Sequence, residues 1–525
     1  MNPPSELRNT DSRSRRTAGV CLHITALPGP FGIGELGRSA FSFVDELKAM
    51  GLTLWQFLPL GPTAYGDSPY QPLSSFAGNE MLIDIGELLR LGLLSNEEVQ
   101  PLTGLPAATV DFGRLIPLKT ALLSLAASRF DARADSSLRA AKDDFCQRNE
   151  DAWLRDYALY RTLKTLHGER AWPEWPQKFR RRYARSLQKI QREHAAALHA
   201  VRVTQFLFHH QCRALRDYAR ENGIQLFGDV PIYIALDSAD AWATPQIVQI
   251  DRDGQPQFVA GVPPDYYSED GQLWGNPLYD WNYHEQTRYR WWGERFRHTM
   301  QYADLVRIDH FRGFEAYWAV PASATTARSG SWQPGPGYRL FDALREQLGG
   351  LPIVAENLGV ITPEVEALRN HYQMPGMIIL QFDASNEGFE PDGIDPNNLV
   401  YTGGHDNDTT QGWFHGGPGD TRTAAEVARQ QHIVLQKTGG TATTIHLDLA
   451  RMACNSKGRI AIIPMQDFLG LGAEARFNTP GTDSGNWRWR LLHEQLTAKL
   501  REQVRTLVSE GRRLPQQAGG QRRSA

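Results

Sequence analysis

The stretch D-L-V-R-I-D-H-F-R-G-F, residues 304–314, joins an apolar run to a cluster of charged side chains. Its first half is rich in leucine, valine and isoleucine, which favours a buried strand. Asp309 follows this strand and is flanked by Arg307, His310 and Arg312. Because charges are costly to desolvate, we expect this end of the strand to face an open site. A neighbouring arginine favours the ionised carboxylate that a nucleophile requires. A structural ion pair that caps the strand is the alternative interpretation.

Seven further apolar runs have strand character, and helical patterns separate most of them. Eight strands that alternate with helices predict an α/β fold, a (β/α)₈ TIM barrel. Two large insertions, after strands two and three, account for the length of the chain. The predicted strands in chain order are 18–24, 52–58, 224–230, the opening run within 304–314, 352–356, 377–382, 399–402 and 459–464.

Changes in local composition along the sequence also divide the chain into parts. We expect a disordered N-terminal arm over 1–17, a catalytic barrel over 18–500 and a C-terminal tail over 501–525, in which a frayed helix gives way to disorder. The charged, helix-rich stretch at about 82–201 predicts an inserted helical subdomain. The stretch at about 240–285, rich in Pro, Gly and aromatic residues, predicts a lid or substrate loop. No C-terminal β-sandwich domain is expected.

The composition excludes some function classes. The 525 residues are 41% hydrophobic and 22% charged, and the net charge of -3 gives no field for nucleic acid or a membrane surface. No apolar run approaches the roughly 20 residues that span a bilayer. The four cysteines are far apart and form no CxxC pair, which indicates free thiols and a cytoplasmic location. The chain has 14 Trp, 17 Tyr and 22 Phe, and such rings either fill a large core or bind the flat faces of sugars.

Four carboxylates are predicted to lie at the C-terminal rim of the barrel, where the active sites of this fold are found. They are Asp229, Asp309, Glu356 and Asp406. Asp309 and Glu356 follow adjacent strands, and a pair of carboxyl groups about 5–5.5 Å apart is what a retaining glycosidase needs. One carboxylate attacks the anomeric carbon, and the other protonates the leaving oxygen and then deprotonates the incoming hydroxyl. A divalent metal site is the rival for this cluster, but the sequence has no HExxH or similar spacing.

Several motifs resemble the signature regions of the 4-α-glucanotransferases of glycoside hydrolase family 77, the amylomaltase or disproportionating enzyme group. They are collinear, they span roughly residues 19–490, and they are highly specific in combination. The motifs are P-L-G-P-T-A-Y-G-D-S-P-Y-Q at 59–71, G-D-V-P-I-Y at 228–233, G-V-P-P-D-Y-Y-S-E-D-G-Q-L-W-G-N-P at 261–277, R-I-D-H-F-R-G-F at 307–314, A-E-N-L-G at 355–359, H-D-N-D-T at 405–409 and R-F-N-T-P-G-T at 476–482.

This resemblance implies a role for each matching residue. Asp309 is the expected nucleophile, Glu356 the general acid/base and Asp406 the residue that stabilises the transition state. Tyr65 is expected in a second, remote glucan-binding groove that some members have. The other expected substrate-binding residues are Arg307, His310, His405, Asp229, Tyr70, Ser68, Asp265, Gln272 and Trp274.

The resemblance further implies α-1,4-glucans and glucose as partners, with no cofactor, metal, nucleic acid or membrane, in a monomer or weak homodimer. One position departs from the family: Gly404 stands where a threonine is usual, and its missing side chain is expected to loosen the loop that holds His405 and Asp406. Two other functions stay open at this point. They are an α-1,4-glucan hydrolase of the amylase type and a catalytically inactive glucan-binding protein.

Overall fold

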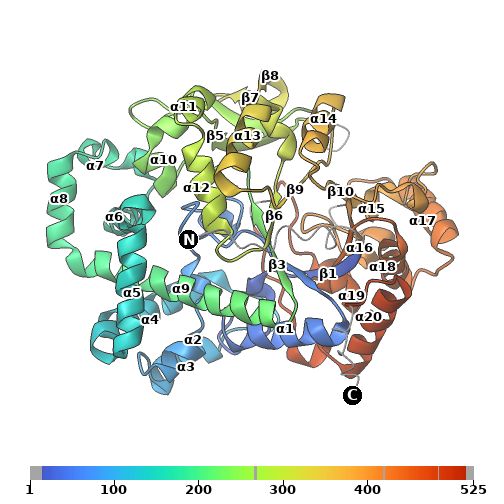
Figure 1. The fold of residues 1–525 in the computed structure, drawn as a ribbon, viewed down its shortest axis with the longest axis horizontal. Helices are drawn as coiled ribbons and strands as arrows, with labels where there is room; N and C mark the ends of the chain where they lie inside the picture. The colour runs from blue at the N-terminus through green and yellow to red at the C-terminus, as the bar shows by residue number, and fades with distance from the viewer. Residues whose placement is uncertain (1–14, 265–268, 418–419, 483, 516–525) are drawn as a thin grey trace, which may run out of the picture.

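A computed structural model describes residues 15–264, 269–417, 420–482 and 484–515, and its centre is an eight-stranded parallel sheet curled into a barrel (Figure 1). The strand order β10-β11-β12-β1-β2-β3-β6-β9 confirms the predicted (β/α)₈ architecture. The strands are β1 Thr17–Cys21, β2 Leu54–Gln56, β3 Gln225–Val230, β6 Leu305–Ile308, β9 Ile353–Ala355, β10 Met377–Ile379, β11 Leu399–Tyr401 and β12 Ile460–Pro464.

The barrel closes between β9 and β10, the two ends of this strand order. The backbone N–H of Ala355 donates to the carbonyl of Pro375 over 2.9 Å. The side chain of Asn357 accepts from the N–H of Met377 over 2.8 Å. The sixth strand is shorter than predicted, because the chain turns into the short helix α15, Leu380–Asp383, directly after Ile379.

Side chains that alternate along each strand fill the barrel interior. They form an apolar cluster of their own, which includes Leu54, Phe227, Val354, Met377 and Tyr401. At the C-terminal ends of three adjacent strands, the next inward-facing positions carry charged side chains instead of apolar ones. These charged side chains belong to the candidate site and lie directly above the apolar layers.

Helices surround the barrel on the outside. Their apolar stripes face the strands, as in α1, where Phe43, Val44 and Leu47 are buried. The helices that lie between or after the barrel strands along the chain include α1 Arg38–Met50, α9 Ala195–Glu221, α12 Arg290–Thr299, α13 Tyr338–Leu348, α14 Pro363–His371, α16 Thr410–His415, α17 Ala424–Thr438, α18 Ile445–Asn455, α19 Met465–Leu469 and α20 Ala498–Glu510.

The stretch predicted as a helical subdomain forms a group of helices at one side of the barrel, coloured from blue through cyan to green at the left and lower left of Figure 1. It is anchored by α9, the long helix that leads back into β3 and packs against α4 and α6. Its elements are α2 Ile85–Arg90, α3 Asn96–Thr103, α4 Phe112–Arg133, α5 Ser136–Asn149, the π-helical turn η6 Glu150–Leu154, α6 Arg155–Leu166, α7 Gln177–Arg180 and α8 Ala184–Glu193.

A small antiparallel sheet, at the top of Figure 1, is built from two separate segments of the chain. Strands β4, Phe258–Val262, and β5, Gln272–Pro277, come from the predicted lid, which also holds the helices α10, Ala239–Ala243, and α11, Trp281–Gln286. Strands β7 and β8, Ala316–Pro321 and Ser331–Pro334, follow the fourth barrel strand, where no strands were expected. The pairing of β4 with β7 is a long-range contact, so local sequence patterns give no sign of it.

The expected boundaries near both ends of the chain need correction. Strand β1 begins at Thr17, inside the expected arm, and pairs with β12. Helix α20 runs across residue 500 to Glu510 and packs on α1 and α18. Beyond it, the side chain of Arg513 is fully buried and donates to the carbonyls of Cys454 and Gly458. The proposed disorder at 1–14 and 516–525 lies outside the described residues.

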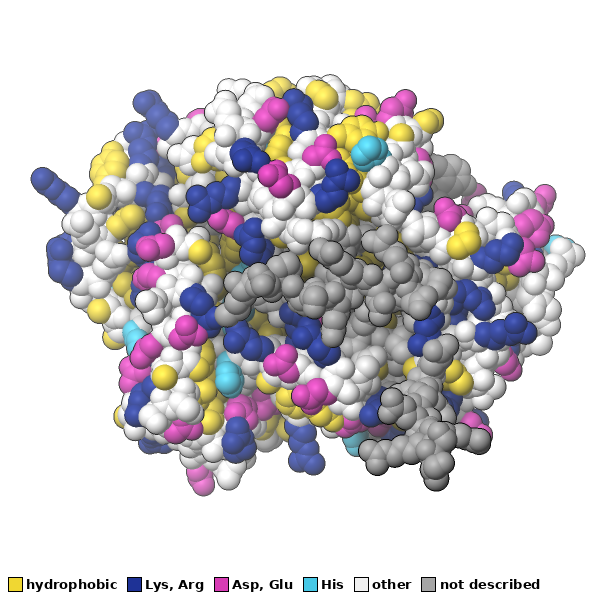
Figure 2. Space-filling model, viewed as in Figure 1, with side chains coloured by type: hydrophobic (Ala, Val, Ile, Leu, Met, Phe, Trp, Pro, Cys, Tyr) yellow, Lys and Arg dark blue, Asp and Glu magenta, His cyan; other side chains and the backbone are white. Residues whose placement is uncertain are grey.

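The four cysteines are free, as predicted. In the part of the chain that the structure describes, no helix is both long and apolar enough to cross a membrane. On the face that Figure 2 displays, acidic and basic side chains are interspersed, in keeping with the small net charge.

Candidate active site

Arg307 on strand β6 and Asp309 directly after this strand lie at the mouth of the barrel. The register of β6 pairs Arg307 with Asp229 on β3, so the two groups face each other at one level. The guanidinium donates one hydrogen bond to Asp229 and one to Asp309, each over 2.7 Å. Arg307 is only 5% exposed, and two carboxylates offset the cost of burying its charge. The side chain of Asp309 is 29% exposed, so it is open to solvent at the rim.

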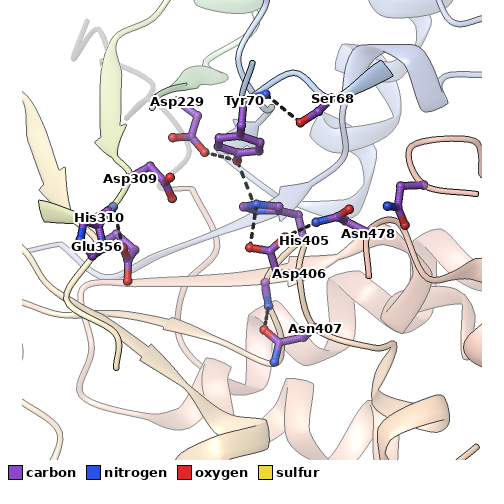
Figure 3. Close-up of polar contacts among 12 residues, drawn as sticks. Ser68, Tyr70, Asp229, Asp309, His310, Glu356, His405, Asp406, Asn407 and Asn478 are labelled. Atoms are coloured by element: carbon purple, nitrogen blue, oxygen red, sulfur yellow. Dashed lines mark hydrogen bonds and ion pairs between the residues drawn. The ribbon is translucent and has the colours of Figure 1, made fainter. Parts of the chain in front are cut away.

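Glu356 follows the next strand, β9, and lies beside Asp309. Ile308 of β6 pairs with Ala355 of β9, so Asp309 and Glu356 are the next residues along these two neighbouring strands. The carboxyl oxygens of Glu356 accept from the backbone N–H groups of His310, over 2.6 Å, and Leu358, over 2.7 Å. Figure 3 shows Asp309, His310 and Glu356 together on one side of the site.

The environment of Glu356 favours its protonated form. The pKa of Glu356 is raised to about 7: burial is the largest cause and the charge of Asp309 adds to it, while Arg307 and the two N–H donors act in the opposite direction. Two neighbouring carboxyl groups in different environments can divide the roles of proton donor and nucleophile. Here Glu356 is buried and Asp309 is partly exposed.

A chain of polar contacts crosses the site from Asp229 to Asp406 (Figure 3). The Tyr70 hydroxyl donates to Asp229 over 2.8 Å, and its ring stacks on His405 with centroids 4.8 Å apart. His405 Nε2 lies 3.3 Å from a carboxylate oxygen of Asp406. The other oxygen of Asp406 accepts from Asn478 over 2.6 Å.

These contacts set the charge of the pair formed by His405 and Asp406. Desolvation by the surrounding protein would by itself raise the pKa of Asp406, but His405 and the hydrogen bond from Asn478 hold that pKa well below its ordinary value. Burial alone would lower the pKa of His405, and the Asp406 carboxylate raises it instead. Asp406 is therefore a carboxylate at neutral pH, and its side chain is 51% exposed to the site.

Several hydrogen bonds hold the loop around Gly404. The N–H of Gly404 donates to the Asn407 side chain over 2.8 Å, and Arg476 donates to the carbonyl of Asp406 over 2.8 Å. A Cβ added at Gly404 would meet the Asn407 oxygen at 3.3 Å. The glycine lines a cavity of about 30 Å³ beneath His405, which is room for about one water molecule.

The expected binding residues on the loops reach the site in part. Trp274 of β5 packs edge-on against the ring of His310, with centroids 4.8 Å apart, and its indole N–H donates to Gln272. The Ser68 hydroxyl accepts from the N–H of Tyr70 over 3.2 Å, which holds the loop that carries Tyr70. Asp265 lies outside the described residues. Tyr65 lies in the short helix η4, Tyr65–Asp67, and the structure does not describe its side chain.

Sequence reasoning missed two residues that shape the site. Asn478 and Arg476 hold Asp406 from a loop that lies 70 residues or more further along the chain. The motif R-F-N-T-P-G-T at 476–482 was the available signal, because it contains both residues, but the motif alone did not assign them a role.

Comparisons with known proteins agree on one family. The sequence model described as 4-alpha-glucanotransferase matches residues 22–496. The 4-alpha-glucanotransferase of Thermus thermophilus is 44% identical over 510 residues, which cover 95% of this chain and 99% of that protein. The protein of the same name from Synechocystis sp. is 42% identical over 489 residues, 92% of this chain and 95% of that protein. The structure of amylomaltase from Streptococcus agalactiae in complex with acarbose superposes with a TM-score of 0.90 at 36% identity, and the match covers 95% of this chain and 100% of that chain.

Proposed function

The chain belongs to the 4-alpha-glucanotransferase family, glycoside hydrolase family 77, and we propose that it transfers a segment of a 1,4-α-D-glucan to the 4-hydroxyl of an acceptor. The acceptor is glucose or another glucan. One observation carries the proposal: Glu356, with its pKa raised to about 7, stands next to the partly exposed Asp309 at the ends of adjacent strands.

The first half of the reaction breaks the donor bond. Glu356 in its protonated form donates its proton to the glycosidic oxygen, and the Asp309 carboxylate attacks the anomeric carbon. The products are a covalent β-glucosyl ester on Asp309 and a shortened glucan with a free 4-hydroxyl. Arg307 positions Asp309 through its 2.7 Å hydrogen bond and is itself held by Asp229.

The second half reverses the roles. Glu356, now a carboxylate, takes the proton from the incoming 4-hydroxyl, whose oxygen attacks the anomeric carbon and releases Asp309. Asp406, kept negative by His405 and Asn478, stabilises the oxocarbenium-like transition state of both steps. We assign contacts to the sugar hydroxyls to His310, His405, Asp229 and Tyr70, and contacts further along the glucan to Ser68, Asp265, Gln272 and Trp274. Tyr65 belongs to a separate groove.

Transfer requires an acceptor hydroxyl to outcompete water for the covalent intermediate. Trp274 lies on the small antiparallel sheet and packs against His310, next to the nucleophile. An aromatic wall at this position supports an acceptor sugar by stacking and displaces water from the ester. The same carboxylates can also serve a hydrolase, which makes the product pattern the test that separates the two activities.

Maltotriose as sole substrate is expected to give glucose together with a ladder of longer glucans. Each transfer moves an anomeric carbon from one glycosidic bond into another, so no reducing end is gained or lost and their number stays nearly constant. Chromatography of the oligosaccharides, paired with a reducing-sugar assay on the same samples, checks this. An increase in reducing ends equal to the number of bonds cleaved would show a hydrolase, and unchanged maltotriose would show an inactive glucan-binding protein.

Replacing Asn478 by alanine is expected to lower kcat/KM for maltotriose by roughly 10- to 100-fold, because Asp406 loses a hydrogen bond to a charged acceptor. The pKa of Asp406 should also rise, so the loss should be larger at acid pH. The matched control is Asn486→Ala in the same loop; Asn486 bonds to Thr479 and Thr482 instead of Asp406. Equal losses in both variants at every pH would contradict a specific role for Asn478.

We further propose a cytoplasmic enzyme that acts without a cofactor or metal, as a monomer or weak homodimer, in the metabolism of glycogen, starch or maltose. The free cysteines support a reducing compartment. For the domains, we propose a catalytic barrel that carries the helical subdomain at about 82–201 and the lid at about 240–285.

A further inference from the structure

A second cavity, of about 240 Å³, lies where the helical subdomain meets the barrel. It shares no lining residue with the candidate active site. Its walls come from the loop after β2, from the beginning of α6, from α10 and from the helices α11 and α12. A water molecule occupies about 30 Å³ in the liquid, so the cavity has room for roughly eight waters or one small organic ring with its substituents.

Local sequence builds the subdomain side of this cavity. The π-helical turn η6, Glu150–Leu154, interrupts the path from α5 to α6. Such turns are rare and are frequent at functional sites. Here the turn places Trp153 in the wall, with Tyr157 one turn further along α6. Both rings are buried, at 7% and 2% exposure, whereas Ala152 at the rim is exposed.

The barrel side adds more aromatic rings. Phe76 comes from the loop that carries Tyr70, while Tyr283 and Trp291 come from α11 and α12. Phe76 and Trp291 meet edge to face, with centroids 6.2 Å apart. These three rings are only partly buried, so part of their surface is available to a bound molecule.

Three carboxylates share the same walls, and each already has a donor. Asp156 accepts from Arg182 over 2.6 Å, Glu294 accepts from Arg290 over 2.7 Å, and Asp240 accepts from the N–H of Ser75 over 2.7 Å. A carboxylate has about four acceptor positions, so each can accept more hydrogen bonds. Because the two arginines offset much of the negative charge, the lining favours a neutral ligand with many hydroxyl donors over an ion.

Aromatic faces combined with carboxylate acceptors are the chemistry that binds a pyranose ring. We propose that this cavity is a further saccharide site, which holds one glucosyl unit of an α-glucan away from both the catalytic cleft and the Tyr65 groove. The choice of α-glucan as the saccharide rests on the proposed function.

Binding of maltotriose to the Asp309→Asn protein counts sites without turnover. Isothermal titration is expected to show two sites in this background once Tyr65→Ala also removes the separate groove assigned to Tyr65. The additional substitution Ala243→Phe should leave one, because Ala243 lines the cavity, is half-buried and ends α10, so the larger ring fills the space. Trp153→Ala, which removes one face, should weaken the second site on the order of 10-fold. The matched control is Ala425→Phe, at an exposed position on α17.

In the active protein, Ala243→Phe should raise KM for long amylose several-fold and leave maltotriose turnover unchanged. Two sites that persist when Ala243→Phe is added to the Asp309→Asn, Tyr65→Ala protein, or one site in that protein before Ala243→Phe is added, would overturn the proposal. Failure of the proposed function is separate, since it appears as unchanged maltotriose or net hydrolysis in the parent protein, while this titration counts bound sugar.

Discussion

Asp309→Asn is expected to lower the transfer rate on maltotriose by about 10⁴-fold or more, because the amide cannot form the glycosyl ester. Asparagine has nearly the same shape and still accepts the hydrogen bond from Arg307, so folding should be preserved. The loss should persist with α-maltosyl fluoride, a donor whose leaving group needs little protonation. Rates of glucose and fluoride release measure the two donors, and thermal unfolding reports on the fold.

The matched control is Asp392→Asn, an exposed aspartate after α15, whose activity should stay within twofold of the parent. Azide offers a positive test, since it can occupy the place of the missing carboxylate. With α-maltosyl fluoride and azide, Asp309→Asn should release the β-glycosyl azide. Activity of Asp309→Asn near that of the parent on either donor would remove Asp309 from the mechanism.

Glu356→Gln is expected to lower kcat/KM for maltotriose by about 10²–10⁴-fold, the range typical of general acid catalysis. On α-maltosyl fluoride the first step should remain fast, because fluoride leaves without a proton. The second step lacks its base, so the glycosyl ester should accumulate as a mass increase of the protein. Azide needs no base and should restore turnover, giving the α-glycosyl azide. This opposite anomer, compared with Asp309→Asn, distinguishes the two roles.

The pH profile gives an independent check on Glu356. Burial raises the pKa of Glu356 to about 7, and in the proposed mechanism the protonated form is the acid for bond cleavage. The parent should therefore keep kcat/KM below this pH and lose it as the pH rises through about 7. Glutamine does not titrate, so the alkaline fall should vanish in Glu356→Gln. Glu364→Gln, at an exposed position on α14, should keep the profile of the parent. An alkaline fall that survives in Glu356→Gln would contradict the assignment.

The sequence by itself determined the barrel and the position of its rim. Each predicted strand is a short apolar run, and each carboxylate follows such a run directly, so local patterning placed Asp229, Asp309 and Glu356 at strand ends. The carboxyl ends of parallel strands lie at one edge of the barrel, so the sequence alone predicts that these residues are neighbours. The family motifs extended this to His405 and Asp406.

Only the tertiary structure determined which residues hold the rim side chains in place, and only the tertiary structure formed the second cavity. The hydrogen bond from Asn478 to Asp406 spans 72 positions, and the pairing of β4 with β7 spans a comparable stretch. The raised pKa of Glu356 comes from burial, which depends on every element that covers it. The cavity between subdomain and barrel is bounded by four separate parts of the chain. Local patterns report the faces that an element must bury, whereas contacts between distant segments depend on how those faces meet, which is a property of the folded chain alone.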